Sequence, residues 1–162
     1  MIEVRPYILS DIEQMITVWN EVVHAGNAFP QETSLSNESA NLFFEEQSLC
    51  AVAVEEGVVL GLYILHPNNI GRCSHIANAS YAVSSASRGK RIGRSLVIDS
   101  LNRCQQLGFK GLQFNAVVDS NLAARALYED LGFTHIGCVP QGFLMKDGSY
   151  EDTHIYFHAT DA

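Results

Sequence analysis

The chain has 162 residues, 47% of them hydrophobic, which is enough for one buried core and short for two domains. We therefore expect a single domain over residues 1–162. The formal net charge of −8 at pH 7 argues against a nucleic-acid partner, because such surfaces depend on clustered Lys and Arg.

The first predicted elements are a strand and a helix. Ile2–Ile8 alternates apolar and polar residues, as a half-buried strand does. Ser10 and Glu13 then form the Ser-x-x-Glu pattern of a capping box, which predicts a helix from about Asp11 to Ala25.

A polar loop and six further strands follow. The loop Asn27–Asn37 is either a substrate lid or an ordinary connection, and a short helix is predicted over Asn37–Glu46. Beyond it, runs rich in β-forming residues are separated by turn residues. These runs are Leu49–Val54, Val58–Leu65, His75–Val83, Gly111–Val118, Thr134–Val139 and Glu151–His158.

The cysteines and the N-terminus bear on the cellular compartment. The segment Met1–Pro6 has no signal-peptide pattern, and no apolar run reaches the length of a membrane span. Four cysteines lie without metal-ligand or paired spacing, at Cys50, Cys73, Cys104 and Cys138. We therefore expect reduced thiols, no metal site, no membrane partner and a cytoplasmic location.

A basic loop joins the strand that ends at Val83 to an amphipathic helix predicted over Arg94–Leu107. A strand, loop and helix in this order present unpaired N–H groups at the positive end of the helix dipole. Gly89 and Gly93 permit close approach of the backbone to a ligand. Four of the ten basic side chains lie here: Arg88, Lys90, Arg91 and Arg94. The loop therefore predicts a pyrophosphate cradle, although its spacing fits neither a dinucleotide fingerprint nor a P-loop.

Two motifs carry a family resemblance. Arg88-Gly89-Lys90-Arg91-Ile92-Gly93 resembles motif A of the GCN5-related N-acetyltransferase (GNAT) superfamily, [QR]-x-x-G-x-[GA], with Arg91 in place of the middle glycine. The segment Asn121–Tyr128, closed by Leu131-Gly132-Phe133, resembles its motif B. The resemblance implies an α/β (α+β) fold: a mixed, mostly antiparallel seven-stranded sheet with helices on both faces. Its fourth and fifth strands would be parallel and splayed to admit the cofactor.

The resemblance also implies a cosubstrate, acetyl-CoA, and the residues that bind it. Main-chain amides of motif A would hold the pyrophosphate, while the fourth strand and the motif B helix would touch the pantetheine arm. The residues carried over are Tyr81, Ala82, Val83, Arg88, Gly89, Lys90, Arg91, Ile92, Gly93, Arg94, Asn121 and Ala124.

Tyr128 is the expected general acid. By the resemblance it would stand beside the thioester sulfur and protonate the departing thiolate. A phenol of pKa about 10 is protonated at neutral pH yet acidic enough for that role. Without motif A, a core aromatic would be the preferred interpretation. Some relatives carry a glutamate base in the fourth strand, but Ala77 stands there, so the candidates are a water chain or His75, which is also interpretable as a structural histidine.

Two asparagines are candidate substrate contacts. Asn78 and Asn115 interrupt apolar strands, and a buried amide needs a partner, which is either a substrate group or neighbouring main chain. The segments Ser74–Tyr81, Gln113–Asn115 and Val139–Phe143 resemble a narrower branch that includes fungal enzymes acetylating proline analogues such as azetidine-2-carboxylate. That likeness implies a small amino acid or cyclic amine as acceptor.

We therefore expect an acyltransferase that moves acetyl directly from acetyl-CoA to a small-molecule amine. Two alternatives stay open: acetylation of a protein N-terminus or lysine, and a non-catalytic acyl-CoA-binding module. The superfamily also commonly forms homodimers through the last strands, which this sequence leaves open.

Overall fold

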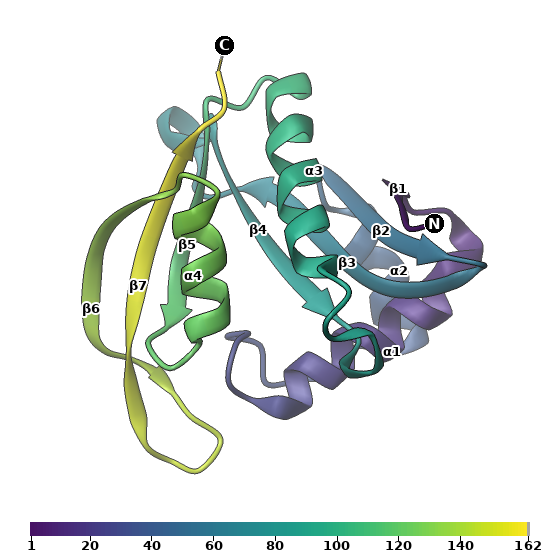
Figure 1. Cartoon of the computed structure of the whole chain (residues 1–162), viewed down its shortest axis with the longest axis horizontal. Coiled ribbons are helices and arrows are strands. Elements are labelled where there is room, and N and C mark those ends of the chain that lie inside the picture. Colours follow the sequence, from purple (N-terminus) through teal and green to yellow (C-terminus); the bar gives the residue numbers. More distant parts are fainter. Residues whose placement is uncertain (162) are drawn as a thin grey trace.

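In the computed structural model, which describes residues 1–161, seven strands form one sheet in the order β1-β2-β3-β4-β5-β7-β6 (Figure 1). Among these strands β4 and β5 are parallel, and the other neighbours are antiparallel. The strands are β1 Glu3–Pro6, β2 Leu49–Glu55, β3 Val58–Pro67, β4 Ile76–Val83, β5 Gly111–Val118, β6 Thr134–Leu144 and β7 Tyr150–Ala159. The expected mixed sheet with a parallel β4–β5 pair is confirmed.

Helices cover both faces of this sheet (Figure 1). They are α1 Ile12–Ala25, α2 Asn37–Glu45, α3 Ile92–Gln106 and α4 Leu122–Asp130. Because side chains alternate along a strand, one sheet face packs on α1 and α2 through residues such as Trp19 and Leu62. The other face packs on α3 and α4 through residues such as Leu96 and Leu112. Within residues 1–161, no helix is long and apolar enough to cross a bilayer.

The start of α1 differs from its prediction. Ser10 lies in a 3₁₀ turn, Leu9–Asp11, and the helix begins one residue later than expected, at Ile12. The Asp11 carboxylate accepts from the Ile8 N–H at 2.9 Å and from the Arg5 guanidinium at 2.7 and 3.1 Å. The predicted Ser10–Glu13 capping box is therefore wrong, because the buried aspartate satisfies the turn instead.

Strand β6 is longer than predicted because a bulge hides its second half. Pro140 and Gly142 look like the end of a strand, but pairing with β7 resumes at Phe143 after a register shift. Gln141 takes a positive φ of 52° in the shifted stretch. The ladder then continues to Leu144, which brings the β6–β7 hairpin to the α1 side of the molecule.

The parallel pair β4–β5 is short. Its ladder contains two residue pairs, Ile76 with Gly111 and Ala77 with Leu112, after which the strands diverge (Figure 1). Strand β4 stays paired with β3 up to Val83 on its other edge. The sheet therefore opens along its middle while both halves remain hydrogen-bonded.

Candidate active site

A cavity of about 740 Å³ lies where β4 and β5 diverge. Its walls come from both strands, from the end of α1 and the loop after it, from the start of α3 and from one face of α4. Among the residues predicted from sequence, the cavity wall contains Asn78, Tyr81, Val83, Arg88, Gly93, Asn115, Asn121, Ala124 and Tyr128. Elements that are distant in the sequence thus meet around one space.

The N-terminus of α3 forms one end of this cavity. Gly89 and Arg91 both take left-handed backbone conformations, with φ of 85° and 60°. Arg91, which stands in place of the usual glycine of motif A, thus adopts a left-handed conformation that glycine takes without strain, at a cost of about 1–3 kcal/mol. Within the described chain, no side chain caps this 15-residue helix, so its first N–H groups and positive dipole end face outward.

The buried Tyr63, the half-buried Tyr81 and a glycine fix the position of α3 on the sheet. The Tyr63 hydroxyl donates to Asp99 at 2.6 Å, and the Tyr81 hydroxyl lies 2.7 Å from the Ser100 hydroxyl. At Gly61, a Cβ would come within 2.9 Å of both the Ala82 carbonyl oxygen and the Ile92 side chain. The helix start therefore sits against bare backbone of β3.

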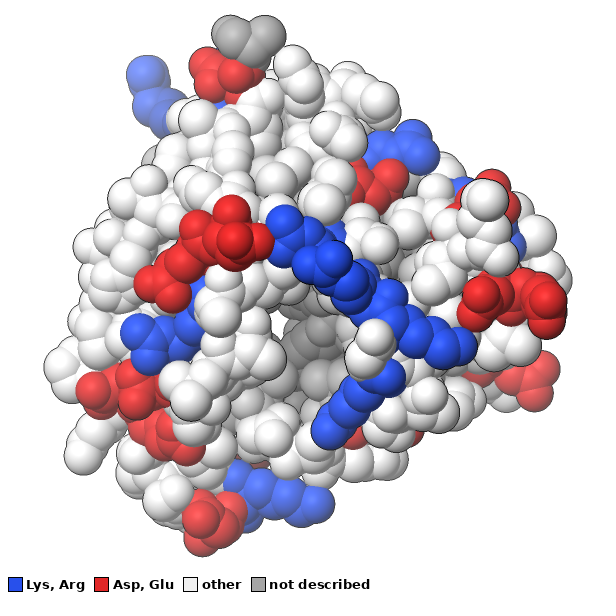
Figure 2. Space-filling view, viewed as in Figure 1, with Lys and Arg blue, Asp and Glu red and all other residues white. Residues whose placement is uncertain are grey.

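Basic side chains gather around the same helix end. Figure 2 shows them over the lower end of α3, beside a hollow in the surface. Lys90 pairs with Glu55 at 3.4 Å, and Arg94 pairs with Asp130. In residues 1–161, neither Arg88 nor Arg91 forms an ion pair, which leaves their charge available for an anion.

Not all predicted cofactor residues line the cavity directly. Ala82 is fully buried on the α1 face, and Ile92 is buried beneath the start of α3. Four other predicted residues are not part of the cavity wall and lie in the basic loop and first turn of α3 beside it: Gly89, Lys90, Arg91 and Arg94. The backbone N–H of Ile92 lies at the uncapped helix start, whereas its side chain is buried.

Tyr128 lies in an aromatic cluster at the other end of the cavity. Its ring centroid is 4.5 Å from that of Phe114 and 5.8 Å from that of Tyr156. Burial, and then the neighbouring Tyr156, raise the pKa of Tyr128 well above its ordinary value of 10.0. Tyr128 is therefore protonated at neutral pH.

Asn121 and Ala124 lie on the same face of α4 as Tyr128. The Asn121 side chain caps the helix by accepting a hydrogen bond from the Ala124 N–H at 3.3 Å.

Side-chain amides cross the point where β4 and β5 diverge. Asn78 donates to the Gln113 carbonyl oxygen at 2.8 Å. Asn115 accepts from the Gln113 side chain at 3.0 Å and donates to Asn68 at 2.6 Å. Within residues 1–161 both ends of the Asn115 amide are thus paired, whereas no hydrogen bond uses the Asn78 amide oxygen. Asn68, which follows β3, was missed in the sequence because its partner Asn115 lies on β5, 47 positions away.

The structure does not bring His75 to this cavity. His75 is exposed in the turn before β4, and its carbonyl oxygen accepts from Lys110 N–H at 2.8 Å. Asn78, the first cavity residue of β4, lies three residues further on, roughly 10 Å along a strand. Strand β4 starts at Ile76 because that residue pairs with β5. This pairing places His75 at the end where β4 and β5 are still joined, away from the cavity.

Glu21 is an acidic residue of the cavity wall that sequence analysis did not single out. Its carboxylate accepts from the Ser85 N–H at 2.7 Å and from the Ser85 hydroxyl at 3.1 Å. This contact ties α1 to the turn that precedes the basic loop. No sequence signal marked it, because the two residues are 64 positions apart.

A second cavity, of about 680 Å³, adjoins the first. Phe29 and Pro30 line both cavities. The second lies between the loop after α1 and the β6–β7 hairpin, and Lys146 lines it. Lys146 donates to the His24 carbonyl oxygen at 2.9 Å and forms no ion pair with a carboxylate in the described chain.

This chain resembles acetyltransferases in sequence and in structure. The Acetyltransferase (GNAT) family model matches residues 13–133. N-acetyltransferase aca1 of Schizosaccharomyces pombe is 32% identical, over 85% of this chain and 74% of that protein. A GCN5-related N-acetyltransferase from Kribbella flavida is 33% identical, with a TM-score of 0.90 over 98% of this chain and 97% of that one. A putative acetyltransferase from Salmonella typhimurium, solved with its cofactor acetyl-CoA, shares the fold at 21% identity, with a TM-score of 0.92 over 99% and 94% of the two chains.

Proposed function

Since the chain belongs to the acetyltransferase (GNAT) family and is an acetyl-CoA-dependent acyltransferase, we propose that it acetylates a small amino acid or cyclic amino-acid analogue. The resemblance of residues 88–93 and 121–133 is confirmed at the level of the family, and a fungal N-acetyltransferase is among the relatives. The proposal treats residues 1–162 as one N-acetyltransferase domain, which the continuous sheet supports. The observation that carries it is the single cavity joining the start of α3 to Tyr128.

The residues at the start of α3 fit the diphosphate of acetyl-CoA. Open space surrounds the Cβ position of Gly89, and the nearest atom to a Cβ on Gly93 is 3.8 Å away. The uncapped helix end supplies N–H donors, and Arg88 and Arg91 supply unpaired positive charge. In our proposal Val83, Asn121 and Ala124 face the pantetheine arm along the diverging strands.

Tyr128 holds the proton that the leaving group needs. Acetyl-CoA supplies an activated acyl group, and its carbon–sulfur bond breaks as the amine nitrogen bonds to the carbonyl carbon. The aromatic surroundings that raise the pKa of Tyr128 would also raise the proton affinity of a thiolate in the same cavity. Burial therefore shifts donor and acceptor in the same direction, and Tyr128 remains able to donate.

The substrate amine loses its own proton to water. An amine must be neutral to attack, and Glu21, a carboxylate in the cavity wall, is engaged with Ser85. His75 lies outside the cavity, so we do not assign it a role in proton transfer. We expect kcat/KM to rise with pH as the neutral fraction of the acceptor amine grows.

The polar groups of the cavity favour an amino-acid acceptor. The free amide oxygen of Asn78 can accept a hydrogen bond from the N–H of the substrate amine, while Asn115, whose amide oxygen and nitrogen both have partners, shapes the wall. Lys146 in the adjoining cavity provides a cation for a carboxylate. A substrate that carries both an amine and a carboxylate would match these two groups.

A thiol-release assay with acetyl-CoA tests the acceptor class. The panel contains amino acids, cyclic imino acids, polyamines and peptides. We expect turnover with amino acids or cyclic imino acids. Turnover with peptides alone would contradict the small-molecule assignment, and would favour acetylation of protein N-termini or lysines. Binding of acetyl-CoA without turnover on any acceptor would contradict the proposed function.

Substitution of Tyr128 by Phe tests the catalytic assignment. The ring and its packing remain while the proton donor is lost, so we expect kcat to fall about 10²-fold or more with little change in the KM for acetyl-CoA. Steady-state kinetics with the best acceptor of the panel measure both quantities. His75→Ala is the control and should leave the pH profile of kcat/KM unchanged. An unaltered kcat in Tyr128→Phe would show that another group protonates the thiolate.

A further inference from the structure

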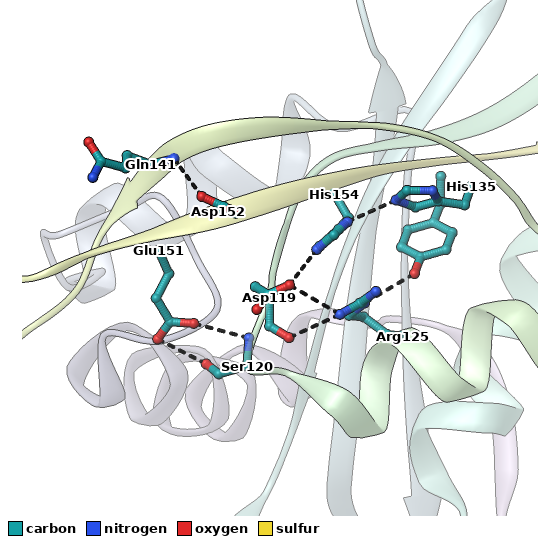
Figure 3. A network of polar contacts seen from close by, with 9 residues as sticks. Asp119, Ser120, Arg125, His135, Gln141, Glu151, Asp152 and His154 are labelled. Atoms are coloured by element: carbon teal, nitrogen blue, oxygen red, sulfur yellow. Dashed lines mark hydrogen bonds and ion pairs between the residues drawn. The ribbon is translucent and has the colours of Figure 1, made fainter.

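A chain of hydrogen bonds joins helix α4 to the strands behind it (Figure 3). His135 Nε2 lies 2.8 Å from His154 Nδ1, and His154 Nε2 lies 2.7 Å from Asp119 Oδ1. Arg125 Nη1 donates to the same carboxylate oxygen at 3.2 Å and to the Asp119 carbonyl oxygen at 3.3 Å. The proposed chemistry uses none of these four residues.

Chemistry fixes the direction of these hydrogen bonds. The hydrogen bond from His154, and then the nearby Arg125, hold the pKa of Asp119 below its ordinary value, so this carboxylate only accepts. His154 must therefore donate from Nε2, which makes its Nδ1 an acceptor when the ring is neutral. His135 then donates from Nε2. His135 of β6 and His154 of β7 thus hold the Asp119 carboxylate in place independently of its contact with α4.

The Arg125 guanidinium donates hydrogen bonds to two different residues, Asp119 and Tyr156. Besides its bonds to Asp119, its Nε donates to the Tyr156 hydroxyl at 3.3 Å, and the Tyr156 side chain is fully buried. The guanidinium thus fixes α4 both to the residue after β5 and to β7. A planar group with fixed donor directions restricts the rotation of the helix as well as its distance from the sheet.

Apart from Arg125, helix α4 is held by the exposed Arg94–Asp130 ion pair and by the packing of half-buried side chains such as Leu127. It spans nine residues, and none of them is fully buried. An isolated helix of this length is unstable in water, so its position depends on tertiary contacts. Tyr128 follows Arg125 by three positions on the same helix, and no hydrogen bond within residues 1–161 holds the Tyr128 hydroxyl. The direction of that hydroxyl is therefore set by where the helix lies.

We propose that Arg125 is a positioning residue for Tyr128, working against an Asp119 carboxylate that His154 and His135 hold in place. This inference rests on the proposed function, because it needs Tyr128 to be the proton donor. His135, His154 and Asp119 then affect catalysis through the position of α4, without contact with either substrate. A purely structural role of Arg125 would instead affect stability and cofactor binding.

A double-mutant cycle separates these roles. The variants are Arg125→Ala, Tyr128→Phe and the double variant, with kcat and the KM for acetyl-CoA measured for the full chain on the best acceptor. We expect Arg125→Ala to lower kcat about 10- to 100-fold with the KM for acetyl-CoA nearly unchanged, as for a misplaced catalytic group. In the Tyr128→Phe background the same change should lower kcat by less than about threefold.

Equal factors in both backgrounds would overturn the inference, because Arg125 would then act independently of Tyr128. Should Arg125→Ala not fold, Arg125→Lys replaces it in the cycle, since it keeps the charge and loses the two-point geometry. Glu129→Gln, an exposed change on the same helix, is the matched control and should keep kcat within about twofold. No effect of Tyr128→Phe alone would instead refute the proposed role of Tyr128, which distinguishes the two failures.

Discussion

At the scale of single residues, Asp11 is a nearly buried carboxylate whose pKa is lowered, chiefly by the hydrogen bond from Arg5. A group with a lowered folded-state pKa stabilises the fold above its unfolded-state value, about 3.9, and that contribution is lost as pH falls through the folded-state value. We expect Asp11→Asn to lower the free energy of unfolding by about 1.5–3 kcal/mol at pH 7.

Denaturant unfolding between pH 7 and pH 3 measures this effect. The difference between Asp11→Asn and the unaltered chain should be constant down to about pH 5 and shrink below about pH 4. Glu46→Gln removes an exposed carboxylate and serves as the control. A difference that kept its full size at pH 3 would mean that the ionised carboxylate is not its source.

The amino-acid sequence predicted some residues of the candidate site and missed others, for a physical reason. Tyr128 and Asn121 were predicted from the likeness to motif B, whose residues lie close together on one helix, and both line the cavity. The left-handed backbone of Arg91 was not predictable, since such a conformation in a residue other than glycine depends on its surroundings. Asp119 and His154 were missed because they are 35 positions apart and meet only across strands.

At the scale of elements, Gly61 of β3 determines how closely α3 approaches the sheet. The space that a Cβ would need is occupied by a carbonyl oxygen and a buried isoleucine, which cannot move freely. We expect Gly61→Ala to destabilise the fold by about 1–3 kcal/mol and to raise the KM for acetyl-CoA, because the helix start must shift.

Thermal unfolding and steady-state kinetics measure these two effects. Gly137→Ala is the matched control, since it makes the same change in a strand where no atom lies within 4 Å of the new Cβ. Its stability and KM should stay close to those of the unaltered chain. A raised KM in both variants would mean that the approach of α3 is not the cause.

Element types were predictable while several boundaries were not. Alternating and β-rich runs identified the seven strands, helical patterning identified α1 and α3, a short helix was predicted at α2, and motif B identified α4. The end of β6 was missed because Pro140 and Gly142 signal a turn, whereas the bulge lets pairing resume at Phe143. The starts of β4 and α3 depend on the partner strand and on the loop conformation, which periodicity does not report.

At the scale of the whole molecule, the sheet consists of two parts that meet at two residue pairs of β4 and β5. A ligand that fills the cavity would contact both parts and add the contacts that the open seam lacks. We expect coenzyme A at 100 times its Kd to stabilise the fold by about 2.7 kcal/mol, which raises Tm by roughly 5–10 °C in a chain of this size.

Thermal unfolding at increasing coenzyme A concentration checks this expectation. Adenosine at the same concentrations is the control, because it lacks the diphosphate and the pantetheine arm and should leave Tm nearly unchanged. An equal shift with adenosine would mean that binding does not involve the cavity between the strands. The mixed, mostly antiparallel sheet and its parallel fourth and fifth strands followed from the family resemblance, whereas how far the seam opens depends on packing from both faces.

The short seam also bears on the order in which the chain folds. Strands β1 to β4 and strands β5 to β7 complete antiparallel ladders within their own halves, whereas the parallel pair needs the whole crossover through α3 for two residue pairs. Closing that long connection costs loop entropy and returns little ladder, so we expect it to form after the main kinetic barrier. Coenzyme A should then slow unfolding and leave the refolding rate nearly unchanged.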